Sequence, residues 1–508
     1  MRRPVRDLFA ILPEGVLTHA AHWDRLQSAP ITALCYDSRL AAEGTVFFCL
    51  VGKTLDGHVY AESAYRKGCR FFVTQKELDQ PADAVVLVVP DTRTAMADCA
   101  AAVYGHPERE MRLIGLTGTK GKTTTALLIQ NLLTAAGIPA GYVGTNGVDY
   151  GGYHFDTVNS TPESVEIYRH LRGMLDAGVK VCALEVSSQA LWMGRIRGLV
   201  FDSVLFLNLS RDHIGGVEHP TMEHYRDCKK LLFSDYPAEA LIANADDGTT
   251  PFMADGVATP VETFSTRSPG AHWYASKIRS AKVGDRLGVA FTVSHEGETV
   301  NGSWFLPLPG EFNVQNALAA LAVVCGRFGV EPHRAGELMA GASVAGRFET
   351  VTSAALPGVT FVIDYAHNGV SLTSVLDTLR GYDPKRLICL FGSVGGRTRE
   401  RRKDLAEAAA YRADLCVLTA DNPANEPVMD IIGEIDSHFP ADGCPRIHEP
   451  DREAAIRMLV EQAQAGDIIL LAGKGHETYQ LIGTRRVPFS EKEILREALR
   501  ERALAEIC

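Results

Sequence analysis

A short stretch with the features of a phosphate-binding loop is the strongest chemical signal in the sequence. Residues 113–117 read LIGLT, an apolar run typical of a buried strand, and residues 118–124 read GTKGKTT, directly before an apolar segment that favours a helix. Glycines let backbone N–H groups turn toward an anion, and the start of the helix adds its dipole. Lys122 would supply a positive charge and Thr123 a hydroxyl for Mg²⁺. We therefore expect ATP to bind the residues Gly118, Thr119, Lys120, Gly121, Lys122, Thr123 and Thr124.

The loop departs from the common spacing G-x-x-x-x-G-K-[ST], because Leu116 stands where the first glycine of that pattern would be. A glycine-rich turn that binds nothing is the alternative. The strand and the helix expected on either side of the loop favour the phosphate site.

Polar side chains near the ends of two further expected strands could complete a magnesium site. Glu185 lies in the apolar run 181–186, and His213 follows the run 203–207 after a short polar segment. Lys229 comes shortly afterwards. Open α/β sheets bind ligands at the carboxyl ends of their strands, so we expect these groups near the phosphate loop. Oxygen and nitrogen ligands of this kind would hold the Mg²⁺ that ATP chemistry requires.

Alternating strand-like and helix-like segments predict an α/β protein with mostly parallel sheets and three domains. Residues 1–110 form the first domain, residues 111–346 the second, which contains the phosphate loop, and residues 347–508 the third. The patterns predict strands at 46–51, 84–89, 181–186, 203–207, 287–293, 302–308, 360–363, 387–391, 415–418 and 468–472, and helices at 61–67, 123–136, 165–177, 314–328 and 492–506.

The composition is that of an ordinary globular protein: 46% of the 508 residues are hydrophobic and 22% are charged. A net charge of −11 argues against non-specific nucleic-acid binding. The 11 cysteines include no C-x-x-C pair, which favours a reducing compartment and gives no sign of structural zinc. The sequence shows neither a secretory signal nor a membrane span. We expect a cytoplasmic monomer without nucleic-acid or membrane partners.

Nine motifs, in an order that covers essentially the whole chain, resemble those of the Mur ligases. Within that family the resemblance is to the group that adds the third residue to the UDP-N-acetylmuramoyl peptide of bacterial cell-wall synthesis. The motifs are TGTKGKTTT at 117–125, NSTPES at 159–164, EVSSQAL at 185–191, NLSRDHIGGVEHP at 208–220, GEFNVQNALAA at 310–320, GRFE at 346–349, DYAH at 364–367, DNPANEP at 421–427 and GKGHETYQ at 473–480.

The resemblance implies three α/β domains: a UDP-binding domain, a central ATP-binding domain and a Rossmann-like domain that binds the amino acid. It also implies a role for each matched residue. Lys122, Glu185, His213 and a carbamylated Lys229 would be catalytic. Thr123, Glu185, His213 and Lys229 would hold Mg²⁺, as two ions. ATP would also meet Asn313, Asn316, Arg347 and Asp364. The UDP-muramoyl peptide would bind Ser38, Asn159, Ser160, Thr161, Ser188 and Arg195. The amino acid would bind Arg397, Asp421, Asn422, Ala424, Gly475 and Glu477.

The implied reaction joins a carboxylate and an amine. Transfer of the ATP γ-phosphate to the carboxylate of UDP-N-acetylmuramoyl-L-alanyl-D-glutamate would give an acyl phosphate, which the amine of a free diamino acid would then attack. Three positions depart from the family pattern: Lys120 replaces a common asparagine, Gln189 a histidine, and Gly396 an aspartate before the arginine aligned with Arg397.

Ala424 bears on which diamino acid is added. In members that add meso-diaminopimelate, the DNP motif continues with arginine, whose fork suits the distal carboxylate of that substrate. Here the motif continues with alanine, which favours L-lysine. The segment 475–477 resembles the diaminopimelate-adding type instead, so meso-diaminopimelate is the alternative, and ornithine is a third possibility.

Two more distant alternatives remain. A folylpolyglutamate-synthetase-like ligase would share the phosphate loop and the acyl phosphate, but it would lack the separate first domain. A non-catalytic nucleotide-binding protein would not need Lys122, Glu185, His213 and Lys229 together.

Overall fold

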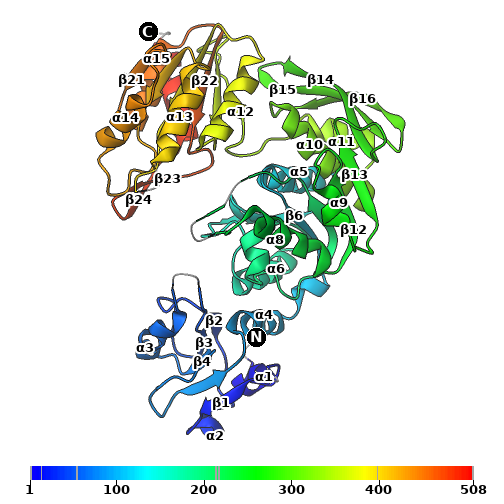
Figure 1. Cartoon of the computed structure of the whole chain (residues 1–508), viewed down its shortest axis with the longest axis vertical. Coiled ribbons are helices and arrows are strands. Elements are labelled where there is room, and N and C mark those ends of the chain that lie inside the picture. The colour runs from blue at the N-terminus through cyan, green and yellow to red at the C-terminus, as the bar shows by residue number, and fades with distance from the viewer. Residues whose placement is uncertain are drawn as a thin grey trace. The chain divides into compact units, whose positions relative to one another are not determined.

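The structure, a computed structural model, describes residues 3–12, 14–52, 55–211, 214–215, 218–396 and 399–505 (Figure 1). These residues form an α/β protein with mostly parallel sheets, which confirms the predicted fold class. The chain divides into two compact units. Unit 1 comprises residues 1–274 and 318–331, and unit 2 comprises residues 275–317 and 332–508. The predicted domain boundaries at 110/111 and 346/347 remain predictions.

The N-terminal part of unit 1 is a five-stranded sheet in the order β1-β5-β4-β3-β2, parallel except for β1. All four residues of β3, which lies between β4 and β2, are buried, which explains why it reads as an unbroken apolar run. Its elements are α1 (Val5–Phe9), β1 (Val16–His19), α2 (Trp23–Leu26), β2 (Ala33–Cys35), β3 (Thr45–Phe48), η1 (Gly57–Tyr60), α3 (Ala61–Arg66), β4 (Phe71–Thr74), β5 (Val85–Val88), α4 (Thr92–Val103) and η2 (Pro107–Arg109).

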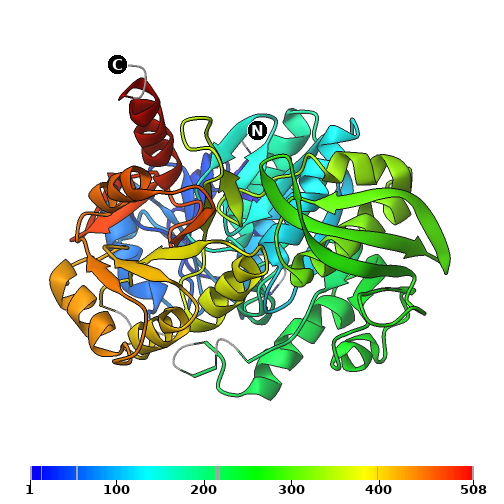
Figure 2. The ribbon, with the colours of Figure 1, turned by 90° about the horizontal axis from the view of Figure 1, so that it is seen from above.

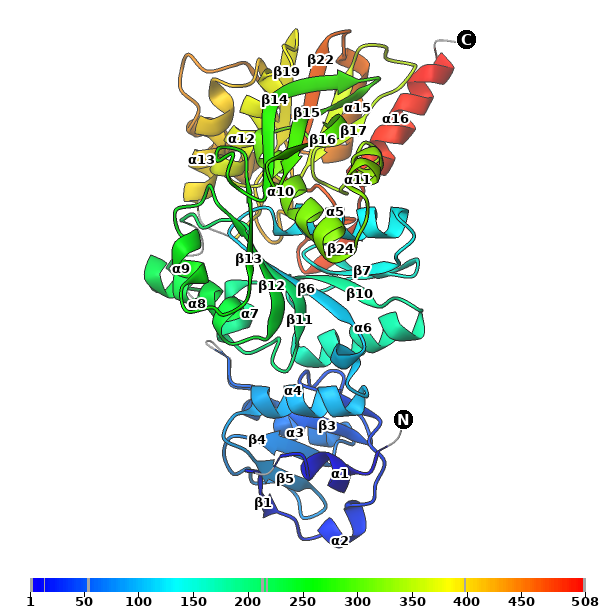
Figure 3. The same cartoon turned by 90° about the vertical axis from the view of Figure 1, so that its right-hand side faces the viewer.

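A second sheet fills the rest of unit 1, with β6 in the middle between β10 and β11. In Figure 3, α5 lies on one side of β6, β7 and β10, and α6 lies on the other. The elements are β6 (Arg112–Thr117), α5 (Lys122–Ala135), β7 (Ala140–Gly144), β8 (Gly147–Tyr150), β9 (Tyr153–Phe155), α6 (Ser164–Asp176), β10 (Val181–Glu185), α7 (Ser188–Trp192), β11 (Phe201–Phe206), α8 (Met222–Ser234), β12 (Ala238–Asn244), α9 (Thr250–Ala254) and β13 (Val261–Ser265).

The register of this sheet brings the ends of three parallel strands together. Leu116 of β6 pairs with Glu185 of β10 on one side and with Leu205 of β11 on the other. The segments that follow β6, β10 and β11 therefore leave the sheet at one edge, where ligands of such sheets bind.

Unit 2 begins with an antiparallel hairpin and ends with a six-stranded sheet of its own. β14 starts in unit 1 and continues into unit 2, where α11 packs on β16. The last turns of the predicted helix 314–328 are π-helical, a correction to that prediction. These elements are β14 (Trp273–Val283), β15 (Arg286–His295), β16 (Glu298–Leu306), α10 (Glu311–Leu321), the π-helical η3 (Ala322–Arg327, in unit 1) and α11 (Pro332–Met339).

The sheet of unit 2 has the order β17-β18-β22-β19-β20-β21, parallel except for β17. α16, the dark red helix of Figure 2, packs against α15, and both bury apolar side chains on one face of this sheet. The elements are β17 (Glu349–Val351), β18 (Thr360–Asp364), α12 (Gly369–Arg380), β19 (Arg386–Phe391), α13 (Glu400–Ala410), β20 (Leu415–Leu418), α14 (Val428–Ser437), β21 (Arg446–His448), α15 (Arg452–Gln462), β22 (Asp467–Ala472), β23 (Tyr479–Ile482), β24 (Arg485–Pro488) and α16 (Glu491–Ala505).

Two further observations concern the chain as a whole. Within the described ranges, no helix combines the length and the apolar character needed to cross a membrane. The ten cysteines that the structure describes are all free thiols.

Candidate active site

The predicted phosphate loop connects β6 to α5, as expected. Gly121 caps the helix in a left-handed conformation with φ of +87°, which favours glycine. A Cβ atom on Gly118 would lie 3.0 Å from Cβ of Leu207 and 3.2 Å from the backbone nitrogen of Asn208. Glycine is therefore needed at 121 for the left-handed turn and at 118 for the close approach to Leu207 and Asn208. The loop has the form of an anion-binding site.

The loop is fastened to the segment that follows β11. The backbone N–H of Lys120 donates to the Asn208 side chain at 2.9 Å, and the Asn208 amide donates back to the Lys120 carbonyl at 3.1 Å. The Thr119 hydroxyl accepts from the Ser210 N–H at 2.9 Å and donates to the Ser210 carbonyl at 3.2 Å. These bonds hold the backbone of the loop in place, so its N–H groups need little reordering when an anion binds.

Two lysines meet at this loop. The Lys122 ammonium donates to the carbonyl oxygens of Gly118 at 2.8 Å and of Thr119 at 3.2 Å. Lys229 comes from α8, is 1% exposed, and donates to the same Gly118 oxygen at 2.9 Å. Its ammonium also lies 4.4 Å from the centre of the Tyr225 ring.

Glu185 is fully buried at the end of β10 and is surrounded by hydrogen-bond donors. Oε1 accepts from the hydroxyl of Tyr142 and from the backbone N–H of Thr145, the latter at 3.0 Å. Oε2 accepts from the Thr145 hydroxyl at 3.1 Å. Carboxylate oxygens are the ligands that hard cations such as Mg²⁺ prefer.

The residues expected to hold the muramoyl peptide form a connected network beside Glu185. The Thr161 hydroxyl donates to the backbone carbonyl of Glu185 at 2.8 Å, and the hydroxyl oxygens of Ser160 and Thr145 lie 2.9 Å apart. The Arg195 guanidinium donates to the Thr161 carbonyl at 3.2 Å. The same guanidinium pairs with the buried carboxylate of Glu163 at 3.0 Å.

Two side chains from the N-terminal part of unit 1 contact this network. Arg93, at the start of α4, pairs with Glu163 at 2.6 Å. Tyr36 hydrogen-bonds Glu166, and burial, together with the charge of Glu166, raises the pKa of its hydroxyl. Ser38 lies two residues farther along, in a turn where Arg39 pairs with Asp37. Asn159 is half-buried next to Ser160.

Two of the predicted site residues, His213 and Arg397, lie outside the described residues, as does Asp212. Their roles remain predictions.

The ATP-binding residues predicted farther along the chain lie in unit 2 and form two local clusters. Asn313 and Asn316 are buried on α10, where the Asn316 amide donates to the Asn313 side chain at 3.0 Å. Asp364, at the end of β18, accepts from the backbone N–H groups of Phe348 and Ala366 at 2.9 and 2.8 Å. Burial raises the pKa of Asp364, and the charge of Arg347 opposes that rise.

The predicted amino-acid pocket is a polar cluster where β20 and β22 end. The Asn422 amide donates to Glu477 at 2.9 Å, and the Lys474 ammonium donates to the same carboxylate at 2.7 Å. Lys474 is fully buried. Asp421 is also buried, and burial raises the pKa of its carboxyl group.

Ala424 lies next to this cluster and is fixed through its backbone. Its N–H donates to the Leu481 carbonyl at 2.9 Å, and its carbonyl accepts from the Gly483 N–H at 2.7 Å, which docks the β23–β24 hairpin onto the pocket. Both Ala424, with φ of +50°, and Gly475, with φ of +53°, are left-handed.

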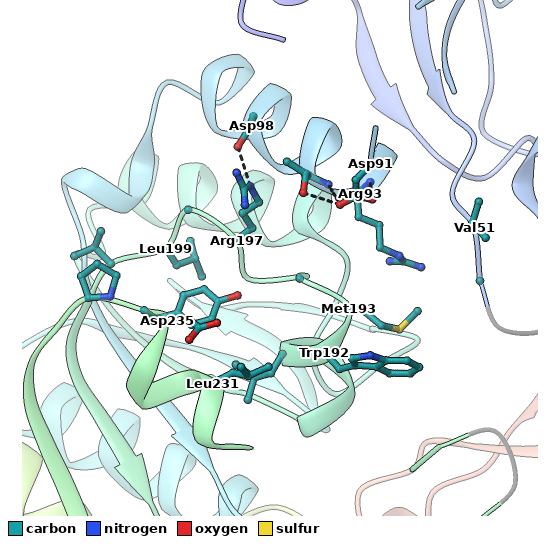
Figure 4. A pocket seen from close by; sticks show the side chains of 18 residues that line it. Val51, Asp91, Arg93, Asp98, Trp192, Met193, Arg197, Leu199, Leu231 and Asp235 are labelled. Atoms are coloured by element: carbon teal, nitrogen blue, oxygen red, sulfur yellow. Dashed lines mark hydrogen bonds and ion pairs between the residues drawn. The ribbon is translucent and has the colours of Figure 1, made fainter. Parts of the chain in front are cut away.

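A separate cavity of about 920 Å³ lies in unit 1 between α4 and the segment that follows α7 (Figure 4). Arg197 and Asp98 form an ion pair at 3.5 Å on its wall, and Trp192 and Met193 supply apolar surface. Neither the phosphate loop nor Glu185 lines it. It therefore does not mark the phosphate site.

Comparisons with known proteins agree with this arrangement. Three family models match in order along the chain: "Mur ligase family, catalytic domain" at residues 30–104, "Mur ligase middle domain" at 116–324, and "Mur ligase, glutamate ligase domain" at 346–475. A protein of Geobacillus thermodenitrificans, named UDP-N-acetylmuramoyl-L-alanyl-D-glutamate–2,6-diaminopimelate ligase, is 37% identical over 93% of this chain and 95% of its own length. The chain belongs to the Mur ligase family. It is thus an ATP-dependent ligase. The membership of this family that the nine motifs predicted is confirmed.

Two further relatives of this Mur ligase carry the same name. One, from Chlorobaculum tepidum, is 37% identical over 96% of each chain. The other is a solved structure with 27% identity and a TM-score of 0.65, covering 96% of this chain and 99% of its own. Both names are those of the group that adds the third residue to the UDP-N-acetylmuramoyl peptide. Their names favour diaminopimelate, so the comparisons do not support the lysine preference that we predicted from Ala424.

Several residues of the Mur ligase site were given no role by the sequence analysis. Tyr142 and Thr145 come from β7 and the turn after it, and Glu163 was part of a motif but had no predicted role. Lys474 likewise stands inside a motif. Tyr142 and Thr145 contact Glu185, and Lys474 contacts Asn422 as well as its neighbour Glu477. Spacing alone does not reveal the contacts between distant residues.

Proposed function

We propose that this Mur ligase joins meso-diaminopimelate to UDP-N-acetylmuramoyl-L-alanyl-D-glutamate, with ATP converted to ADP and phosphate. The observation that carries the proposal is full-length similarity to ligases named for 2,6-diaminopimelate. The phosphate loop, Glu185 and Lys229 at one edge of a parallel sheet support the ATP half of the reaction.

The first step is phosphoryl transfer. A carboxylate oxygen of the dipeptide attacks the γ-phosphorus, the bond to ADP breaks, and an acyl phosphate forms. Lys122 and the N–H groups of the loop stabilise the charge that develops on the phosphate oxygens. Thr161 and Arg195, tied to Glu185 and Glu163, would orient the peptide so that its carboxylate faces the loop.

The residues present fit a magnesium ion. Glu185 offers a fully buried carboxylate. Lys229 does not fit as an ammonium, but as a carbamate it would offer two oxygens at the same place. Thr123 and His213 are the other proposed ligands. When bound, Mg²⁺ neutralises charge on the transferring phosphate.

The second step needs a neutral amine. The amine nitrogen attacks the acyl carbon, inorganic phosphate leaves, and the amine releases a proton as the amide forms. Glu477, held by Asn422 and Lys474, would receive the distal ammonium of the amino acid. Asp421 and Gly475 would complete that end of the pocket, and Arg397 would pair with a carboxylate.

The test is ADP release with UDP-N-acetylmuramoyl dipeptide and a panel of amino acids. We expect meso-diaminopimelate to give a kcat/KM at least about tenfold above those of L-lysine and ornithine. A site that pairs with the distal carboxylate of meso-diaminopimelate would lose this interaction with the other two amino acids, which lack that carboxylate. A higher value for L-lysine would overturn the choice of amino acid. ADP release that needs a folate in place of the dipeptide would overturn the function itself.

A further inference from the structure

Two histidines and a cysteine meet beside the phosphate site, although no role in the proposed function falls to them. His219 precedes α8, and His224 and Cys228 are one turn apart on α8, so both face the same side of the helix. One potential ligand atom from each lies within 4.8 Å of the others. His219 and Cys228 are only 1% and 4% exposed.

We propose that His219, His224 and Cys228 bind a thiophilic divalent cation, with Zn²⁺ the best fit. A thiolate and two imidazoles are ligands that zinc prefers and that Mg²⁺ does not. The site is therefore distinct from the proposed magnesium site at Glu185 and Lys229.

The distances suit tetrahedral coordination. The two Nδ1 atoms of the histidines are 2.9 Å apart, and Sγ of Cys228 lies 3.7 Å from Nδ1 of His224. Zinc bonds of ~2.0–2.3 Å place tetrahedral ligand atoms about 3.3–3.8 Å apart. The remaining pair, His219 and Cys228, lies within 4.8 Å, so side-chain movements of up to about 1 Å would bring all three ligand atoms to this spacing.

The surroundings orient the first ligand. Nε2 of His219 lies 2.9 Å from the hydroxyl of Ser188, so a proton on Nε2 leaves the lone pair of Nδ1 directed at His224. A histidine fixed through its second nitrogen is the usual form of a metal ligand. The aromatic rings of Tyr225 and Trp192 pack against His219 and His224, at 5.0 and 5.5 Å between centroids.

Binding is a simple exchange of protons for metal. The Cys228 thiol loses its proton to solvent as the sulfur–zinc bond forms, and zinc takes the place of any proton shared between the two Nδ1 atoms. Three protein ligands leave the fourth tetrahedral position for water or an anion. Because His219 contacts Ser188, a bound ion would lie next to the proposed peptide-binding network.

The experiment uses the full-length protein, freed of metal by a chelator and returned to Mg²⁺ buffer. Co²⁺ is added first as a spectroscopic probe. We expect one equivalent to produce the charge-transfer band of a cobalt–thiolate bond and the visible bands of tetrahedral cobalt, and Zn²⁺ to abolish both. These readouts do not depend on ligase activity, so they stay separate from the test of the proposed function.

Three variants locate the site. Cys228→Ser should lose the charge-transfer band, and His224→Gln, at a half-buried position, should weaken zinc binding at least about tenfold, since even groups that only orient a metal ligand contribute about 10- to 100-fold. Cys444→Ser is the matched control, because Cys444 lies 3.5 Å from a second thiol, that of Cys416, and outside the histidine–cysteine cluster. The proposal is overturned if no thiolate band forms, or if the band survives in Cys228→Ser.

Discussion

Lys122 and Lys229 donate hydrogen bonds to one carbonyl oxygen, that of Gly118, at 2.8 and 2.9 Å. Two ammonium groups on one acceptor repel each other, and the buried Lys229 cannot move its charge into solvent. Lys122 is placed to follow the phosphate that binds the loop. Lys229 is placed where a positive charge would oppose a metal ion, which is the physical reason to propose that it carries a carbamate.

The first prediction concerns Lys122. Lys122→Ala should leave the melting temperature close to that of the wild type, because the ammonium contacts loop carbonyls rather than apolar core. The turnover should fall by about 100- to 1,000-fold, the usual effect of losing one group that stabilises developing charge. Lys230→Ala is the control, since that ammonium lies 4.4 Å above the ring of Phe252 and away from the loop. Near-normal ligation by Lys122→Ala would refute the assignment.

The second prediction is the carbamate itself. A neutral lysine amine adds to CO₂ and loses a proton, which turns a cation into an anion that can bind Mg²⁺. Protein equilibrated with ¹³C-bicarbonate should show a carbamate carbon resonance that disappears in Lys229→Ala and persists in Lys230→Ala. An experimental structure with Mg²⁺ and nucleotide that shows a free ammonium at Lys229 would rule the carbamate out.

Local patterns predicted the phosphate loop well, because strand, glycine turn and helix are adjacent in the chain. Glu185 followed from the rule that strand ends share an edge, and the structure brings Lys229, from α8, to Gly118. The pairing of Glu163 with Arg195 and with Arg93 of α4 could not be predicted, since it depends on how distant segments pack.

The histidine–cysteine cluster shows the same limit. The sequence contains no C-x-x-C motif, and the cysteine spacing did not predict a zinc site. His219 reaches the cluster because the chain turns into α8 just after it, and only the folded helix places His224 beside Cys228. Ala424 shows a different limit. From this one residue we predicted L-lysine, whereas the relatives are named for diaminopimelate.

The third prediction concerns His170 and acid stability. Burial, and secondarily the charge of Arg169, lowers the pKa of His170 to about 4. Since the unfolded chain titrates near 6.5, it binds more protons than the folded chain between these values, and stability must fall as the pH drops from about 6.5 to 4. Above that window His170 stays neutral in both states and contributes no pH dependence.

Urea unfolding at pH 7 and pH 5 tests this. His170→Gln should lose less stability between the two pH values than the wild type. His333→Gln, at an exposed position, serves as the control and should behave as the wild type does. Equal losses in the wild type and in His170→Gln would contradict the assigned cause.

The fourth prediction is that Gly346 positions the segment of Gly475 and His476. A Cβ atom on Gly346 would lie 2.2 Å from the backbone nitrogen of His476, and φ at this glycine is +68°. Gly346→Ala should therefore cost about 1–3 kcal/mol of stability and raise the KM for the amino acid. Gly341→Ala is the control, because its Cβ would only reach ordinary contact at 3.4 Å. Unchanged melting and KM in Gly346→Ala would show that the segment does not depend on this contact.

The last prediction is that Ala424→Arg sharpens the preference for meso-diaminopimelate over L-lysine. The backbone of Ala424 is held by Leu481 and Gly483 beside the pocket, and its left-handed conformation strains alanine and arginine alike, so the substitution adds no new backbone cost. A guanidinium there would pair with the distal carboxylate of meso-diaminopimelate and repel the ammonium of L-lysine. Such a pair is worth about 2–5 kcal/mol, which is a tens- to thousands-fold change in the ratio of the two kcat/KM values.

Ala424→Leu is the matched control, because it adds bulk without charge and should not raise the ratio. If the arginine and leucine variants show the same ratio, the distal carboxylate does not lie near residue 424, and another group of the pocket must recognise it.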